Sequence, residues 1–387
     1  MKILKILSIV ILLLLVVGCT VDPPVGEETE HTPGLIFELN EDGESYKVVG
    51  YEGTSEDIVI ASTYNTLPVT SVGFKAKNWP TRLCDLPDQL NIHSITLPES
   101  LTSFDHSALT CHQFSTIDTL HIPKNIKYFA HALYNLNRNI DIVIPVDHLY
   151  LKEINANGVE LVVSIDDKEL VYIPFASSET QDLHIPDTIE IVANYAGAYV
   201  NYKSIYLSNS TIKIGDYAFI NTFSRRADLT SSQIYNFGDH IRYIGKSAFH
   251  GGFEVDELII PRNIEYIGSL AFSYNKIQSV VINTNLGIFT NIFNDLIDNN
   301  QNRSNNITII NFKQFDLEDY ILDIFIYNFV YRNFSGKNQT IQIILPENNQ
   351  QAQLCRESIE LSIEVAKLRK LHYTNLPIFI YDSSNVS

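Results

Sequence analysis

Cysteine and basic residues are scarce in this 387-residue chain, which holds 4 cysteines and 27 lysine and arginine residues against 45 aspartate and glutamate residues. So few cysteines exclude a small disulfide-stapled scaffold. The formal net charge of -18 argues against nonspecific binding of nucleic acid, because a phosphate backbone would meet a body of its own sign. Hydrophobic residues make up 45% of the chain, which suits one large or two ordinary folded domains and excludes a disordered chain.

Motifs that carry catalytic or cofactor chemistry are also missing. The chain has no Gly-x-Ser-x-Gly, His-Glu-x-x-His or Cys-x-x-Cys sequence. Gly245-Lys246-Ser247 ends like a phosphate-binding loop, but Gly238 lies seven residues before Gly245, where such a loop needs five. We therefore predict no enzyme, no cofactor and no nucleotide site.

A metal site is the remaining chemical candidate. His106, Cys111, His112 and His131 fall in neighbouring segments of the repeat described below and offer nitrogen and sulfur ligands. No tight ligand spacing joins them, so we predict surface histidines and no bound metal.

The first residues have the order of a secretion signal. Lys2 and Lys5 precede an apolar run over residues 9–17, which is shorter than the roughly 20 apolar residues of a membrane-spanning helix. The run ends at Gly18-Cys19, and this junction resembles a bacterial lipobox. The resemblance implies that residues 1–18 are a lipoprotein signal peptide and that Cys19 becomes the lipidated first mature residue. We expect a bacterial envelope protein that is held to the membrane by lipid and exposed at the surface.

Self-similarity organises most of the remaining chain. Residues 214–219, 244–249 and 267–272 all read Ile-Gly-x-x-Ala-Phe, and fainter copies give an underlying period of about 22 to 23 residues with insertions. Short alternating runs that end in proline lie between these copies, such as Leu183-His184-Ile185-Pro186. Alternation predicts a short strand with one buried face, and proline ends it because it cannot donate a ladder hydrogen bond. Stacked units of this kind predict a parallel solenoid.

Each Ile-Gly-x-x-Ala-Phe segment is expected to form a tight corner. Glycine would allow a turn that a side chain hinders, alanine would leave room for the adjacent coil, and phenylalanine would fill the interior. The structural repeat residues are Gly215, Ala218, Phe219, Gly245, Ala248, Phe249, Gly268, Ala271 and Phe272.

The pattern Leu-x-x-Ile-x-Leu-Pro followed by Ile-x-x-Ile-Gly-x-x-Ala-Phe resembles the BspA-like class of bacterial leucine-rich repeats. Residues 37–73 are similar to that family's usual first hairpin and first repeat. The resemblance implies a β-rich leucine-rich-repeat solenoid of short parallel strands with an N-terminal β-hairpin cap and a mixed α/β C-terminal cap. Three positions depart from the pattern, namely Ala61 in place of proline and Lys77 and Gly197 in place of the aromatic residue. We expect those coils to pack less tightly.

The domain organisation follows from these patterns. Residues 1–18 are assigned to the signal peptide, 19–34 to a flexible tether, 35–312 to the solenoid and 313–387 to a capping region. An insertion near residues 146–181 reads as a hairpin that decorates one face of the solenoid, and residues 350–371 have helical spacing.

The cysteines that remain after Cys19 cannot form a disulfide framework, because Cys84, Cys111 and Cys355 are odd in number. Cys84 and Cys111 lie 27 residues apart, close to one repeat. A bridge between neighbouring coils and buried free thiols both remain open.

The leading functional hypothesis is a noncatalytic, lipid-anchored surface protein that binds a protein or glycan partner through a concave strand face. It agrees with the adhesion that the resembled family implies. His121 and His184 occupy outward strand positions and Tyr206 is an exposed aromatic candidate, as are Tyr172 and Tyr202. The alternatives are a structural envelope component without a dedicated ligand and an enzyme within residues 313–387.

The lipid anchor makes a direct prediction. Replacing the acylated thiol by Cys19→Ala should abolish lipid labelling and partitioning of the protein into the detergent phase, because no other anchor is predicted. Retention of both properties by the variant would refute the lipoprotein assignment.

Overall fold

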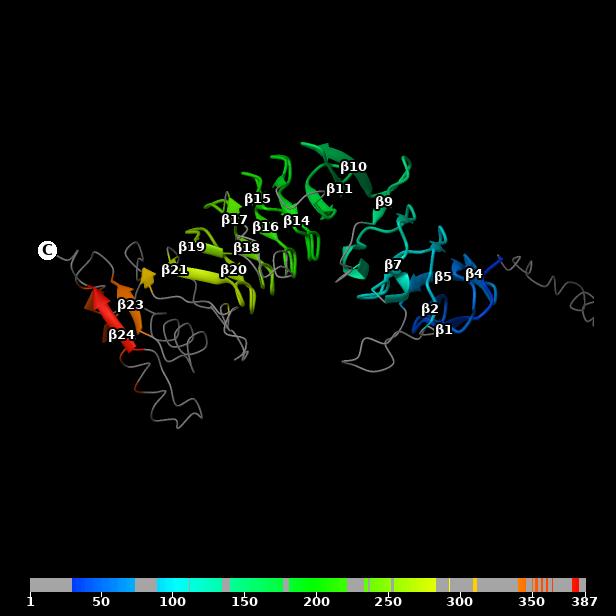
Figure 1. The fold of residues 1–387 in the computed structure, drawn as a ribbon, viewed down its shortest axis with the longest axis horizontal. Helices are drawn as coiled ribbons and strands as arrows, with labels where there is room; N and C mark the ends of the chain where they lie inside the picture. Colours follow the sequence, from blue (N-terminus) through cyan, green and yellow to red (C-terminus); the bar gives the residue numbers. More distant parts are fainter. Residues whose placement is uncertain are drawn as a thin grey trace, which may run out of the picture.

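The computed structural model of the chain is an arched stack of short strands (Figure 1). It describes residues 30–73, 89–110, 112–133, 140–176, 181–220, 233–235, 237–251, 254–282, 292, 309–311, 340–345 and 378–382, together with helical residues 350, 352, 353, 356, 357, 360 and 364. The predicted signal peptide, Lys77 and the four cysteines Cys19, Cys84, Cys111 and Cys355 lie outside the described residues.

Nearly all regular structure in the described ranges is strand. The strands and 3₁₀ helices are β1 (Leu35–Leu39), β2 (Tyr46–Tyr51), β3 (Asp57–Val59), β4 (Thr63–Tyr64), β5 (Leu67–Val72), β6 (Ser94–Thr96), β7 (Ser103–Phe104), η1 (His112–Phe114), β8 (Thr119–His121), η2 (Ala130–Leu133), β9 (Asp141–Val143), β10 (Leu151–Ala156), β11 (Val159–Ser164), β12 (Glu169–Tyr172), β13 (Asp182–His184), β14 (Ile191–Val192), β15 (Ser204–Tyr206), β16 (Lys213–Ile214), β17 (Gln233–Tyr235), β18 (Tyr243–Ile244), β19 (Glu254–Ile260), β20 (Tyr266–Ile267), β21 (Lys276–Ile282), β22 (Ile309–Asn311), β23 (Thr340–Ile344) and β24 (Ile378–Asp382). No helix in these ranges is long and apolar enough to cross a membrane.

The predicted repeats stack in register. Val192, Ile214, Ile244 and Ile267 are partners along the parallel ladder β14-β16-β18-β20, and all four are buried. A second parallel ladder, β13-β15-β17, joins the alternating runs, and the parallel ladder β19-β21-β22-β23-β24 follows it along the chain. Each coil therefore contributes one strand to each of two sheets, and the predicted β-solenoid is confirmed.

The corner between the two sheets is built from the predicted residues. Ala218, Ala248 and Ala271 are fully buried. The rings of Phe219, Phe249 and Phe272 stack along the solenoid, with centroids 5.5 and 5.6 Å apart and planes within 13°. This continuous file of rings is an interior that a single coil could not close.

The corner glycines serve close packing rather than an unusual turn. A Cβ at Gly245 would lie 2.4 Å from the backbone nitrogen of Asp216, and one at Gly268 would lie 2.3 Å from that of Lys246. The left-handed backbone belongs instead to Tyr217, Ser247 and Leu270, with φ of 58°, 51° and 61°. The expectation that these glycines permit the turn was therefore wrong, because the neighbouring coil leaves no space for a side chain.

Backbone hydrogen bonds join each corner to the next. The amide of Phe219 donates to the carbonyl of Ala248 at 2.7 Å, and the amide of Phe249 donates to that of Ala271 at 2.8 Å. In the other direction, the amide of Gly245 donates to the carbonyl of Ile214 at 2.8 Å. Adjacent coils thus satisfy backbone groups of each turn that the turn itself leaves unbonded.

The coil that carries Gly197 at the aromatic position is not loosely packed. A Cβ at Gly197 would lie 2.8 Å from Cδ1 of Phe219 and 3.0 Å from Cδ1 of Ile173. These two side chains fill the space of the missing ring, so the expected looseness is not found there. Ala61, in place of proline, is likewise buried.

The insertion is part of the core rather than a decoration. Strands β10, β11 and β12 pair antiparallel, and β12 then pairs parallel with β14. Leu161, Val163 and Leu170 join the core of the later coils, whereas Val162 and Val171 join the core of the earlier coils. Because both of its faces are buried, the hairpin separates the solenoid into an earlier half and a later half, each with its own core. It lies at the apex of the arch (Figure 1).

Both ends of the described solenoid carry extra structure. β1 and β2 form an antiparallel hairpin whose turn includes Gly43 at φ 71°, and the carboxylate of Asp42 accepts the amide of Glu44 at 2.8 Å. This confirms the N-terminal hairpin cap. At the other end, β22, β23 and β24 continue the parallel sheet across residue 312, and the helical residues between 350 and 364 agree with the predicted helix.

Removing one ring of the stack should destabilise the solenoid. Phe272 is 1% exposed, so Phe272→Ala should lower the free energy of unfolding by about 3 to 5 kcal/mol through lost burial and a cavity. Tyr266, 53% exposed in the same coil, provides the control, since Tyr266→Ala should change stability by about 0.5 kcal/mol or less. Equal effects in chemical denaturation would contradict a buried ring stack.

The loop before the insertion predicts a pH effect. His148 is buried, and its Nδ1 accepts the amides of Tyr150 at 3.2 Å and Leu151 at 3.1 Å, so this nitrogen carries no proton. Burial lowers the pKa of His148 below its usual value. The stability that neutral His148 contributes to the fold is therefore fully present above about pH 6.5 and is lost as the pH falls below that value.

Comparison with a variant isolates this effect. His148→Asn keeps an acceptor and removes the titration, so wild type should lose more thermal stability than the variant between about pH 7 and pH 5. Parallel losses in the two proteins would show that His148 is not held neutral by these amides.

Candidate functional site

The outward side of the sheet that contains the alternating runs is the candidate site, and we call it the strand face. It comprises the outward residues of β3, β6, β8, β9, β13, β15, β17, β19 and β21. The leucine or isoleucine at the centre of each run points into the core, as Leu183 and Ile205 do at 0% exposure. Most residues on either side of it are exposed or half-buried and are not needed by the core, whereas Ser204 of β15 is 7% exposed.

The position after each buried residue forms a row of apolar and aromatic side chains. Val59 and Ile259 are 41% and 45% exposed. The row, which we call the apolar row, contains Val59, Thr96, His121, Val143, His184, Tyr206, Ile259 and Val281. Apolar side chains that stay exposed on a sheet are a feature of interaction surfaces.

Two of the predicted residues meet in this row. His184 of β13 and Tyr206 of β15 are ladder partners, and their rings stack with centroids 4.2 Å apart and planes within 7°. His184 is exposed and Tyr206 is half-buried. Tyr235 of β17 follows in the same register. The pair is a flat aromatic platform on the strand face.

The third predicted residue lies elsewhere on the face. His121 is exposed on β8, where it pairs with Val143 of β9. The strands β8 and β9 belong to the earlier half, and β13 begins the ladder of the later half beyond the insertion. His121 therefore does not form one site with His184 and Tyr206.

Of the two other aromatic candidates, Tyr202 was wrong and Tyr172 is half-buried. Tyr202 is 1% exposed, and its hydroxyl donates to the carbonyl of Pro174 at 3.0 Å. Tyr172 lies on β12 between the halves, where burial raises the pKa of its hydroxyl. Both residues are part of the packing around the insertion, whose central position the sequence did not indicate.

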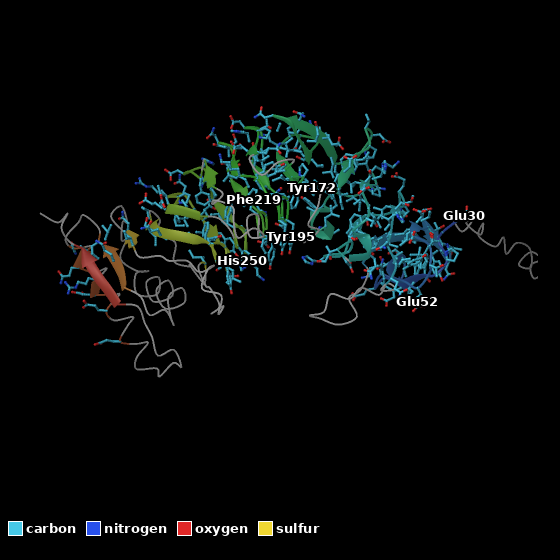
Figure 2. All side chains as sticks on the ribbon, viewed as in Figure 1. Glu30, Glu52, Tyr172, Tyr195, Phe219 and His250 are labelled. Atoms are coloured by element: carbon cyan, nitrogen blue, oxygen red, sulfur yellow. The ribbon has the colours of Figure 1, made fainter. Side chains whose placement is uncertain are left out.

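The strand face does not line the hollow of the arch. In Figure 1, β15, β17 and β19 lie nearer the outer edge than β14, β16, β18 and β20, and β9 lies outside β7 in the earlier half. Figure 2 places Tyr195 and His250, which belong to the corners, at the inner edge. The expected concave binding surface is thus corrected to an outward one.

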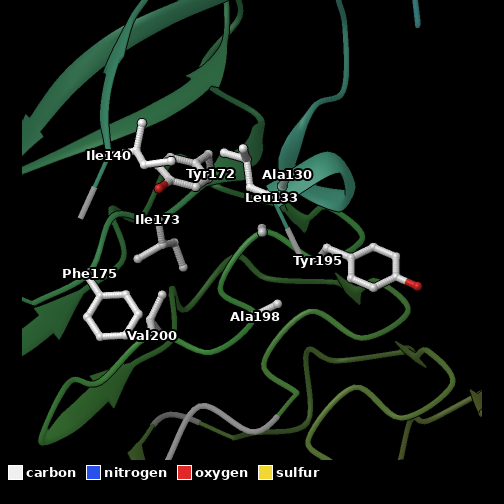
Figure 3. Close-up of a pocket in the computed structure, with 10 residues that line it drawn as sticks. Ala130, Leu133, Ile140, Tyr172, Ile173, Phe175, Tyr195, Ala198 and Val200 are labelled. Carbon is white, nitrogen blue, oxygen red and sulfur yellow. The ribbon is translucent and has the colours of Figure 1, made fainter. Parts of the chain in front are cut away.

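The junction of the two halves holds a small cavity (Figure 3). Its walls come from the earlier coils (Ala130, Leu133, Ile140), the end of the hairpin (Tyr172, Ile173, Phe175) and the first later coil (Tyr195, Ala196, Ala198, Val200). The volume of about 20 Å³ accommodates a single water molecule rather than a ligand. Tyr195 points away from the cavity, and its hydroxyl lies 3.0 Å from Nε2 of His106. This contact joins the two halves.

His106 and His131, two of the histidines considered as metal ligands, have other contacts. Nε2 of His131 lies 2.8 Å from the carbonyl oxygen of Phe104, and burial lowers the pKa of His106. Within the described ranges no three histidine, cysteine or acidic side chains are arranged to hold a metal ion. Cys111, the fourth proposed ligand, is outside those ranges.

A second exposed apolar group was not anticipated. Val146, Leu149, Tyr150 and Ile165 surround the base of the inserted hairpin, with exposures of 108%, 52%, 44% and 49%. The amide of Ile165 donates to the carbonyl of Tyr150 at 3.0 Å, so the two strand-end loops are adjacent. These loops belong to no repeat, so their positions could not be predicted from the register of the repeats.

Comparisons with known proteins address the repeat itself. The family model for the BspA type leucine rich repeat region matches six copies over residues 88–157, 169–300 and 221–341, which together exceed half of the chain. No curated protein matches the chain.

Solved structures of bacterial repeat proteins are similar to the chain at low identity. The pneumococcal vaccine antigen PcpA is 15% identical over 93% of this chain and 99% of its own, with a TM-score of 0.49. A leucine rich cell surface protein of Faecalibacterium prausnitzii is 16% identical over 65% and 87%, with a TM-score of 0.37. A leucine-rich repeat protein of Eubacterium ventriosum is 14% identical over 82% and 84%, with a TM-score of 0.38.

The family assignment rests on the family model, which covers the residues that carry the Ile-Gly-x-x-Ala-Phe corners at 214, 244 and 267. The resemblance inferred from those corners is confirmed, and the chain belongs to the BspA type leucine-rich repeat family.

Proposed function

We propose that this protein is a noncatalytic, lipid-anchored protein of the bacterial cell surface that binds a macromolecular partner through its strand face. The signal-like residues 1–18 and the lipobox-like Gly18-Cys19 support the envelope location. Adhesion or another protein interaction is the role that the family suggests.

The observation that carries the proposal is the aromatic platform formed by the exposed ring of His184 and the half-buried ring of Tyr206. The core does not require either ring, because Leu183 and Ile205 already fill the interior at these strands. Aromatic side chains at protein surfaces supply large contact areas at a small entropic cost, and tyrosine is enriched among residues that dominate binding energy. Ile259 of β19, which is 45% exposed, adds apolar surface in the same half of the solenoid.

A binding screen with the full-length chain tests this function. We expect saturable binding to one member of a panel of host matrix proteins, bacterial surface proteins and glycans. The double variant His184→Ser, Tyr206→Ser should weaken that binding about tenfold or more, because both rings leave the contact surface.

A matched variant controls for lost tyrosine surface elsewhere. Tyr266 is 53% exposed on β20, in the other sheet, so Tyr266→Ser should leave the affinity within about twofold of wild type. If both variants lose the same affinity, the strand face is not the binding site. Absence of saturable binding across the panel would favour a structural envelope component without a dedicated ligand.

A further inference from the structure

The strand face carries a second row beside the apolar row. It consists of the outward residue before each buried leucine or isoleucine, together with the residue that precedes it. Acidic side chains recur there and all are exposed, and we call them the acidic row: Glu56, Asp57, Asp118, Asp141, Asp182, Asp256 and Glu257. Asp118 and Asp141 are adjacent on the paired strands β8 and β9, where the amide of Asp141 donates to the carbonyl of Asp118 at 2.7 Å. The other carboxylates occupy the equivalent positions of strands in the other sheets of the face.

Positive charge is nearly missing from the same positions. Lys203 is the one lysine or arginine that the described strands β3 to β21 place there. His93 lies 3.2 Å from Glu56, the sole ion pair that the described residues form within the row. The acidic row therefore presents a strip of negative potential.

Three carboxylates on other surfaces are paired with a cation within the molecule. Lys47 pairs with Asp105 at 3.0 Å, and Arg242 pairs with Glu265 at 2.8 Å. Lys168 pairs with Glu190 across two coils. By contrast, Asp141, Asp182 and Glu257 make no ion pair within the described part of the chain.

The two rows together restrict the chemistry of a partner. A partner that covers the apolar row must bring apolar surface, and one that also covers the acidic row must bring positive charge to avoid burying unpaired carboxylates. A neutral glycan supplies no such charge, and an anionic glycan would be repelled. Lysine and arginine also favour the faces of tyrosine rings such as Tyr206.

We propose that the occupant of the strand face is a cationic polypeptide segment, whose lysine or arginine side chains face the acidic row and whose apolar side chains face the apolar row. This inference rests on the proposed function and specifies its partner. Charge complementarity would speed association and select the partner, whereas the apolar row would supply most of the contact area.

Three synthetic peptides test the charge requirement on the full-length chain. Each alternates valine with a second residue, which is lysine in the first, serine in the second and glutamate in the third. We expect the lysine peptide to bind saturably and at least about tenfold more tightly than the serine peptide, with no binding of the glutamate peptide. Raising the salt from about 50 to about 300 mM should weaken the lysine peptide several-fold, because screening shortens the reach of the carboxylates.

Variants with the same change of net charge locate the site. Asp182→Asn with Glu257→Gln should weaken the lysine peptide about three- to tenfold, since two carboxylates of the acidic row are lost. Glu41→Gln with Glu52→Gln removes two exposed carboxylates near the N-terminal hairpin and should leave binding within about twofold. Equal losses would reduce the effect to the overall charge of the chain and overturn the proposal.

The outcome separates this inference from the function on which it rests. One outcome would be a partner, such as a neutral glycan, whose binding is lost in the His184→Ser, Tyr206→Ser variant but is unchanged by salt and by Asp182→Asn with Glu257→Gln. That outcome would exclude a cationic polypeptide and would leave the binding function standing. If no peptide and no member of the panel binds saturably, both proposals fail.

Discussion

The fold depends on how closely successive coils approach at the corners. Gly215, Gly245 and Gly268 lie against the backbone of the preceding coil, where a Cβ would meet atoms at 2.6 Å or less. That approach aligns the corner amides with the carbonyls of the next coil and brings the phenylalanine rings into one stack. Since a coil alone leaves several of its corner amides unbonded and cannot enclose its phenylalanine ring, stability is shared along the stack.

Because the corners and the buried residues hold the coils together, the outward residues of the strands are available to contact a partner. The solenoid fixes their spacing and register, so His184 meets Tyr206, and the acidic and apolar rows run side by side across neighbouring strands. The inserted hairpin interrupts the face where its two-sided packing separates the cores. A partner would therefore engage an earlier segment that includes His121 or a later segment that includes His184, each with its own edge of carboxylates.

The sequence predicted the parts of the fold that repeat and did not predict the packing of parts that occur once, such as the insertion. Ile214, Ile244 and Ile267 fell on one ladder because a period shared by several coils specifies their register. The pairing of His184 with Tyr206 follows from the same period, although only the structure shows their stacked rings. The insertion has no copy from which its faces could be read, so the burial of Tyr202 against it was not foreseen. The outward direction of the strand face depends on how the whole stack is arched, which the repeat pattern does not specify.

Hydrogen exchange at the corner amides tests directly whether neighbouring coils hold one another in place at the corners. The account predicts that the amides of Phe219, Phe249, Gly245 and Gly268, which donate only to neighbouring coils, are protected as strongly as those of Ile214 and Ile244 and are lost with them in one cooperative opening. Exchange of the corner amides at the rate of an unstructured peptide, while the ladder amides stay protected, would contradict it.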